Sequence, residues 1–279
     1  MLSNSQILEF IRDGYIKLDR AFPSEWADEG RAILWKDTGC RPDDASTWTK
    51  PVIRLGFYTQ EPFKKSVNTP ALCAAFDQLV GKGNWVGRSS IGTFPVRFPG
   101  TEDPGDTGWH VDGSFPGSGS ADFSTWRVNV KSKGRALLML FLFSDVADPD
   151  APTRIRTGSH LDVARLLAAR GDDGMSFMEL AGKLEITSER RQVLATGKAG
   201  TVYLCHPFLV HAAQSHHGTS PKFMAQPCLE LRNEFQLQRE DGLYSPVELA
   251  IRVGLGESPA DLSDVALAKS DRADFRRKV

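Results

Sequence analysis

The feature that most constrains the fold is an unbroken apolar run near the middle of the chain, Ala136–Phe143. Because none of these eight side chains is polar, a strand here would have to be covered on both faces. The run is too short to span a membrane as a helix, which takes about 20 residues. The chain therefore needs other elements packed on each side of the sheet that contains this strand.

Segments on both sides of this run also have the pattern of strands. Apolar and polar side chains alternate in Ser89–Phe98 and Trp126–Val130, and further apolar segments follow at Thr201–Cys205 and Phe223–Leu231. Clusters of Gly and Pro separate these segments, which is typical of the turns of a β-sandwich or barrel. We therefore expect a mainly β core over about residues 85–235.

Helical patterns precede, interrupt and follow this core. Residues 1–82 are expected to form a helical layer, whose clearest helix begins at Thr69-Pro70. A helical insert is expected at about 161–184, and a C-terminal helix with a polar tail at about 245–279. Since no linker or internal repeat divides the chain, we expect a single domain over residues 1–279.

Composition argues against several classes of function. The 279 residues include 34 basic and 35 acidic side chains, which leaves no positive excess for a nucleic acid. The N-terminal segment lacks the pattern of a signal peptide, and the four cysteines lack the spacing of a structural zinc site. We expect a cytoplasmic monomer or homodimer that binds a small molecule, with no nucleic-acid or membrane partner.

One short motif carries candidate metal chemistry. In G-W-H-V-D-G, an extended backbone would place His110 and Asp112 on one face and Val111 on the other. One imidazole and one carboxylate are two members of the facial triad that binds Fe(II) and leaves positions open. The alternative is a surface histidine beside a turn aspartate. His211 follows the Thr201–Cys205 segment and is the candidate third ligand, although a lone histidine there is more often structural.

The order of these segments resembles the phytanoyl-CoA dioxygenase family of Fe(II)/2-oxoglutarate-dependent oxygenases. The resemblance rests on F-I-R-D-G-Y-I-K-L at 10–18, W-H-V-D-G at 109–113, T-G-S-H at 157–160 and G-T-V-Y-L-C-H-P-F-L-V-H at 200–211. It implies a double-stranded β-helix core of the jelly-roll or cupin-like kind. It also implies that His110, Asp112 and His211 bind Fe(II), and that 2-oxoglutarate and O2 are cosubstrates.

The cation expected to hold 2-oxoglutarate departs from the family pattern. The family places an arginine eleven residues after the distal histidine, and here that position is Lys222. A hydroxyl residue often follows the histidine by two positions, and here Ala213 stands there. A lysine can pair with a carboxylate, but without the bidentate fork of arginine. Arg135 and Arg156 are therefore alternative cosubstrate-binding residues, and each could instead be a solvated surface cation.

The remaining histidines have less specific settings. His206 is expected to pack near the metal site or to support it, and His160 to belong to a turn. His216 and His217 lie in a polar segment and are expected to face solvent.

The resemblance implies hydroxylation of an unactivated C–H bond of a small molecule, with release of succinate and CO2. The substrate could be a metabolite, a natural-product intermediate or an acyl thioester. Asp112 favours oxygenation, because related halogenating enzymes have a small residue at this position. Two alternatives stay open: a cupin-like metal enzyme that does not use 2-oxoglutarate, and a non-catalytic binding protein with the same fold.

Overall fold

A central sheet of six antiparallel strands organises the protein. The computed structural model describes residues 1–117 and 122–257, so the expected polar tail from residue 258 onward lies outside the described residues. The strand order is β1-β10-β6-β13-β3, and β12 also pairs with β6. These strands are β1 (Tyr15–Leu18), β3 (Trp85–Val86), β6 (Leu137–Leu142), β10 (Val202–Cys205), β12 (Met224–Ala225) and β13 (Cys228–Leu231).

Shorter sheets complete the β structure. One consists of three antiparallel strands in the order β11-β7-β9, and two further strand pairs join β2 to β4 and β5 to β8. Their bounds are β2 (Val52–Leu55), β4 (Phe94–Arg97), β5 (Arg127–Val128), β7 (Arg154–Arg156), β8 (Met175–Ser176), β9 (Gln192–Leu194) and β11 (His211–Ala212).

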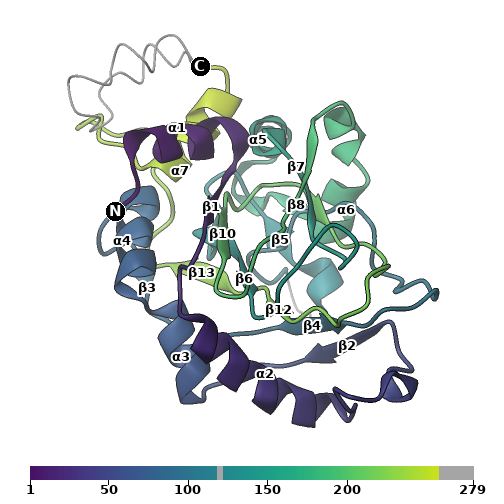
Figure 1. The fold of residues 1–279 in the computed structure, drawn as a ribbon. Helices are drawn as coiled ribbons and strands as arrows, with labels where there is room; N and C mark the ends of the chain where they lie inside the picture. Colours follow the sequence, from purple (N-terminus) through teal and green to yellow (C-terminus); the bar gives the residue numbers. More distant parts are fainter. Residues whose placement is uncertain (118–121, 258–279) are drawn as a thin grey trace.

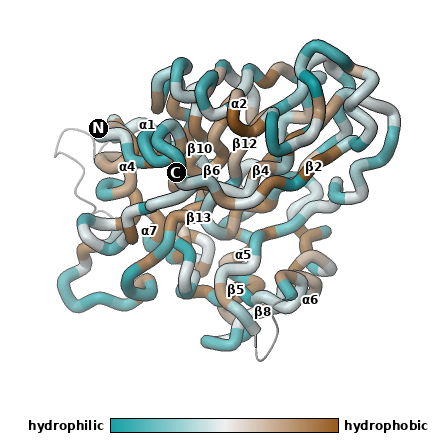
Figure 2. Tube along the Cα trace, turned by 90° about the horizontal axis from the view of Figure 1, so that it is seen from below, coloured by the Kyte–Doolittle hydropathy of each residue, from teal (hydrophilic) through white to brown (hydrophobic). Residues whose placement is uncertain are grey.

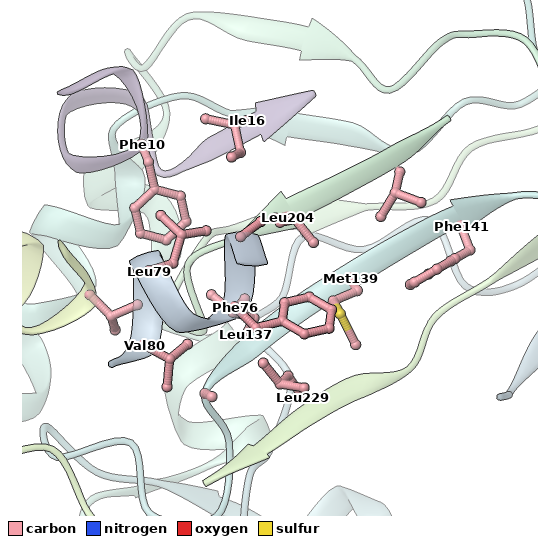
Figure 3. Packing of buried hydrophobic residues seen from close by; sticks show 14 of the residues in the cluster. Phe10, Ile16, Phe76, Leu79, Val80, Leu137, Met139, Phe141, Leu204 and Leu229 are labelled. Carbon is pink, nitrogen blue, oxygen red and sulfur yellow. The ribbon is translucent and has the colours of Figure 1, made fainter. Parts of the chain in front are cut away.

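Both faces of β6 are covered, as the apolar run predicts. On one face, Leu138, Leu140 and Leu142 pack with Ile155 of β7 in a cluster between the central and the three-stranded sheet. On the other face, Leu137 and Met139 belong to a larger cluster with the helices. Figure 3 shows Phe10, Phe76 and Leu79 packed over this outer face. All six residues of β6 are buried, so the prediction of a doubly covered strand is confirmed.

Helices cover the outer face of the central sheet (Figure 1). Figure 2 shows hydrophobic chain at the centre of the molecule and mostly hydrophilic chain in the outer loops. Within the described residues, every helix is too short or too polar to cross a bilayer. The helices are α1 (Asn4–Asp13), α2 (Ser24–Thr38), α3 (Glu61–Val67), α4 (Pro70–Val80), α5 (Ser159–Ala168), α6 (Phe177–Ala181) and α7 (Pro246–Gly254), with short 3-10 helices at Ala45–Thr47, Phe123–Thr125, Gly171–Asp173 and Leu184–Thr187.

The expected start of α4 is confirmed. The Thr69 side chain accepts a hydrogen bond from the backbone N–H of Leu72, and Pro70 occupies the first helical position, where its missing N–H costs nothing. The C-terminal helix is also confirmed, because α7 begins directly after Ser245, whose side chain accepts from Glu248 N.

Three of the expected segments differ in detail from the structure. The N-terminal 82 residues are not all helical, because Gly14 ends α1 at a φ of 84° and the following strand, β1, pairs with β10. The segment Phe223–Leu231 forms two short strands, since Pro227 between them has no N–H to donate. The insert at about 161–184 starts earlier, at Ser159, and contains the short strand β8, which pairs with β5.

Candidate metal centre

The backbone places His110 and His211 side by side. Each residue donates its N–H to the carbonyl oxygen of the other, with both N–O distances 3.0 Å. His211 also belongs to β11, where it lies opposite Ile155 of β7. Residues far apart in the sequence are therefore held together by main-chain hydrogen bonds, and the direction of both imidazoles is set by the sheet.

Three potential ligand atoms converge at this point. The Asp112 Oδ1 atom lies 3.7 Å from His110 Nε2 and 3.8 Å from His211 Nε2. All three atoms lie within 4.8 Å of one another. Atoms at this spacing can reach one metal ion, whose N and O ligands typically lie about 2.0–2.2 Å away. The three residues that the sequence singles out as a triad thus come together in space.

The hydrogen bonds of the two imidazoles suit metal binding. His110 Nδ1 lies 2.9 Å from the Gly108 carbonyl oxygen, and His211 Nδ1 lies 3.0 Å from that of Leu209. A carbonyl oxygen can only accept, so in each neutral ring Nδ1 carries the proton. Both Nε2 atoms are therefore left with a free lone pair directed toward Asp112.

The charges of the site also suit a divalent cation. Burial, followed by repulsion from His110, lowers the pKa of His211 to about 4, so that its imidazole is neutral at pH 7. Burial alone would raise the pKa of Asp112, but attraction to Arg135 and the two histidines outweighs it and lowers the pKa below its ordinary value. Two neutral imidazoles and one carboxylate form the ligand set of non-haem Fe(II) sites.

Lys222 is fully buried and faces the space between the sheets. Its ammonium donates to the Ala151 carbonyl oxygen. Because alternate residues of a strand share a face, Lys222 points to the same side as Met224, which packs in the cluster between the two sheets. Burial, followed by repulsion from Arg97, lowers the pKa of Lys222 well below its ordinary value.

A second buried cation, Arg97, lies beside Lys222 and was missed by the sequence analysis. Arg97 N donates to Lys222 O at 3.1 Å and Lys222 N to Arg97 O at 2.8 Å, so both side chains leave the same face. Arg97 Nη2 donates to Asp106 Oδ2 at 2.7 Å, whereas the buried Nη1 has no hydrogen-bond partner among the described residues. The signal in the sequence was a charged residue at the end of an otherwise apolar strand.

The other two candidate cations have partners of a different kind. Arg135 donates from Nη1 to Asp112 Oδ2 at 3.1 Å and from Nη2 to Gly113 O at 3.0 Å. Arg156 donates to Leu184 O and to Thr187 Oγ1. Its guanidinium carbon also lies 4.3 Å from the ring centroid of Trp109. Arg135 therefore contacts the ligand set directly, whereas Arg156 packs against the residue that precedes His110.

Two expectations about the other histidines were wrong. His160 is completely buried in α5, where its Nε2 lies 3.0 Å from Ile11 O. His216 is also buried, and Ser220 O lies 2.9 Å from its Nε2. Each histidine finds a backbone carbonyl that compensates for its burial. His206 packs against Phe10 and His160, and His217 is exposed.

Comparison with known proteins identifies the family of the chain. The family model described as phytanoyl-CoA dioxygenase matches residues 10–224, a span that contains all three candidate ligands and Lys222. A comparison with curated protein sequences gives no match.

Solved structures show the same fold. HygX from Streptomyces hygroscopicus, crystallised with nickel and 2-oxoglutarate, is 16% identical with a TM-score of 0.54, covering 85% of this chain and 90% of HygX. SnoK, a non-haem alpha-ketoglutarate-dependent carbocyclase from nogalamycin biosynthesis, is 16% identical with a TM-score of 0.53, covering 82% of this chain and 84% of SnoK. The epimerase SnoN, in complex with Fe3+, alpha-ketoglutarate and nogalamycin RO, is 15% identical with a TM-score of 0.53, covering 81% of this chain and 82% of SnoN.

Proposed function

Because this chain belongs to the phytanoyl-CoA dioxygenase family, whose members use Fe(II), 2-oxoglutarate and O2, we propose that it is an oxygenase that hydroxylates an unactivated C–H bond of a small molecule. The observation that carries the proposal is the convergence of His110, Asp112 and His211. The proposal includes a double-stranded β-helix core, formed by the two sheets that enclose the cluster around Leu140, within a single oxygenase domain.

The ligand set fits Fe(II) by its donor chemistry. Two imidazole nitrogens and one carboxylate oxygen would hold such an ion and would leave its other positions open to cosubstrates. The carbonyl oxygens of Gly108 and Leu209 fix the ring orientation of the two histidines, a common supporting contact of metal ligands. Asp112 is the residue that favours oxygenation over halogenation, because its side chain takes the position that a halide would need.

Lys222 and Arg97 are the proposed site for the distal carboxylate of 2-oxoglutarate. Both side chains are buried, and Lys222 makes no ion pair among the described residues. A buried cation without a direct ion pair is unfavourable, and the unused Arg97 Nη1 supplies a further donor. One carboxylate would pair with both groups. We propose this pair rather than Arg135 or Arg156, because the hydrogen bonds of those two residues are directed at Asp112, Gly113, Leu184 and Thr187.

When bound, Fe(II), 2-oxoglutarate and O2 supply the oxidising power for C–H hydroxylation, and succinate and CO2 are the co-products. The contribution of the chain is orientation. His110, Asp112 and His211 fix the position of the ion, and Lys222 and Arg97 fix the far end of the cosubstrate. The ring of Phe177 lies 5.6 Å from that of His110 and forms an apolar wall that helps to exclude water from one side of the site.

Anaerobic absorption spectroscopy tests this proposal without a known substrate. Fe(II) and 2-oxoglutarate together should give a visible charge-transfer band, which reports chelation of the keto acid at the iron. The band should disappear in His211→Ala and persist in the matched variant His217→Ala, because His217 is exposed and makes no contact with the triad.

The outcomes separate the competing functions. Iron binding without the band would favour the cupin-like metal enzyme, whereas failure to bind Fe(II), Mn(II) and Co(II) would favour a non-catalytic binding protein. If the band appears, succinate formation with a panel of natural products and acyl thioesters identifies the substrate class. Product analysis is then decisive for the reaction type, since SnoK is described as a carbocyclase and SnoN as an epimerase.

A further inference from the structure

The two carboxylate oxygens of Asp112 have different partners. Oδ1 is the atom that lies 3.7 Å and 3.8 Å from the histidine Nε2 atoms. Oδ2 accepts a hydrogen bond from Arg135 Nη1 at 3.1 Å. The same guanidinium donates through Nη2 to Gly113 O at 3.0 Å and so holds the side chain of Asp112 and the main chain that follows it.

Arg135 is itself held in place by a tight turn. Its N–H donates to Ser132 O at 3.1 Å, and the Ser132 hydroxyl donates to Arg135 O at 2.7 Å. Within this turn, Lys133 N donates to Asn129 Oδ1 at 3.0 Å. Directly after it, Ala136 N donates to Leu229 O at 2.7 Å and joins the central sheet. The guanidinium is therefore attached to a rigid part of the fold.

The contact is sheltered from solvent. The side chains of Arg135 and Asp112 are 9% and 19% exposed, so salt and water screen their attraction less than at the surface. The planar guanidinium also fixes direction, because its two Nη atoms donate at once to Asp112 Oδ2 and to Gly113 O. Rotation of the carboxylate about its last bond would break the contact between Nη1 and Oδ2.

We propose that Arg135 is a positioning residue that limits Asp112 to one metal-binding oxygen. With Oδ2 held by Arg135, the carboxylate presents only Oδ1 to the ion. A carboxylate free to bind through both oxygens would take a coordination position that a chelating cosubstrate needs. The inference rests on the proposed function and assigns to Arg135 a role in keeping that position open.

The test compares the wild type with Arg135→Gln and Arg135→Lys. Binding of Co(II) and of Fe(II) with 2-oxoglutarate is followed anaerobically by absorption. In Arg135→Gln the apparent Kd for 2-oxoglutarate should rise about tenfold or more, because loss of a residue that orients a metal ligand typically costs about 10–100-fold in metal affinity or activity. The visible band should shift or weaken, and the Kd for Co(II) should change less. The Kd of Arg135→Lys for 2-oxoglutarate should lie between those of the wild type and Arg135→Gln, because lysine keeps the positive charge but not the two planar donors.

Arg88→Gln is the matched control. The Arg88 side chain is also 9% exposed, pairs with Glu230 and donates to Cys228 O, away from the metal ligands. Arg88→Gln should leave the Kd values for Co(II) and 2-oxoglutarate and the visible band unchanged. Wild-type 2-oxoglutarate affinity and spectrum in Arg135→Gln would overturn the inference. If circular dichroism shows that Arg135→Gln does not fold, wild-type 2-oxoglutarate affinity and a wild-type spectrum in Arg135→Lys would overturn the inference. Absence of the band from the wild type itself would instead contradict the proposed function.

Discussion

Arg97 and Lys222 form a backbone pair whose cationic side chains leave the same face of the chain and are both buried. Asp106 lies against Arg97, where one carboxylate oxygen accepts from Nη2 at 2.7 Å and the other has no hydrogen-bond partner in the described part of the chain. The exposed guanidinium of Arg54 pairs with the same carboxylate, so three cations share one negative charge, and a further carboxylate can neutralise part of the excess.

Lys222→Met is expected to weaken 2-oxoglutarate binding. Removal of the ammonium leaves Arg97 as the remaining donor, so the apparent Kd should rise at least about tenfold, equivalent to about 1.4 kcal/mol. Lys222→Arg should retain most of the affinity. Isothermal titration of the Mn(II)-loaded protein measures both values. Lys198→Met is the control, because Lys198 is exposed and paired with Asp145. Equal Kd values for Lys222→Met and the wild type would remove Lys222 from the cosubstrate site.

Metal binding is expected to stabilise the folded protein. A ligand that binds only the folded state adds about 2.7 kcal/mol when its free concentration is 100 times its Kd. Thermal unfolding with Co(II) should therefore show a Tm several degrees above that of the chelator-treated protein. Asp112→Asn should lose most of this increase while keeping its shape. A metal-induced shift of wild-type size in Asp112→Asn would show that the ion binds elsewhere.

Acid should destabilise the fold through His160. Burial lowers the pKa of His160 to about 4, and its Nδ1 has no hydrogen-bond partner among the described residues. The unfolded chain, with an ordinary pKa near 6.5, then binds the proton more readily than the folded protein. The contribution of neutral His160 to the free energy of unfolding is therefore complete above pH 6.5. It decreases as the pH falls, by roughly 3 kcal/mol at pH 4.

Urea denaturation between pH 7 and pH 4.5 measures this effect. His160→Gln, which keeps a donor for Ile11 O, should show a smaller loss of unfolding free energy over the same range. An identical pH dependence in the variant and the wild type would exclude His160 as the cause. His217→Gln provides the control, because that histidine is exposed.

Gly14→Ala should cost far more stability than Gly39→Ala. Both glycines end helices at positive φ, 84° and 70° respectively, so alanine is strained at either position. A Cβ at Gly14 would also lie 2.5 Å from His160 Nδ1, whereas one at Gly39 would have nothing within 4 Å. We expect a cost of about 1 kcal/mol at Gly39 and about 2–4 kcal/mol at Gly14, measured by chemical denaturation. Equal costs would mean that the contact with His160 relaxes freely.

The parts of the fold that were predictable depend on local patterns. The apolar run that forms β6 and the Thr69-Pro70 start of α4 are visible in neighbouring residues, and the structure confirms both. The strand β1 was missed because its four residues become a strand only by pairing with β10, near the other end of the chain. Strand pairing between distant segments leaves little trace in a local window.

The site likewise has parts that follow from neighbouring residues and parts that depend on contacts between distant segments. His110 and Asp112 are two residues apart, so an extended backbone predicts their shared direction, although the structure has an isolated bridge at His110 and no strand there. The position of Arg97 beside Lys222 depends on an antiparallel contact between distant segments, and neither residue alone predicts it. The burial of His160 likewise depends on Ile11, which approaches from α1.

The paired main chains of His110 and His211 have a consequence for how the protein acquires its metal. Their reciprocal hydrogen bonds involve backbone atoms only, so the spacing of the two imidazoles does not depend on an ion between them. The apo-protein is thus preorganised for loading, with little loss of conformational freedom when metal enters. We therefore expect that an ion at this site can be exchanged while the surrounding sheets stay folded, so a protein purified without metal should be reconstituted by simple addition of Fe(II).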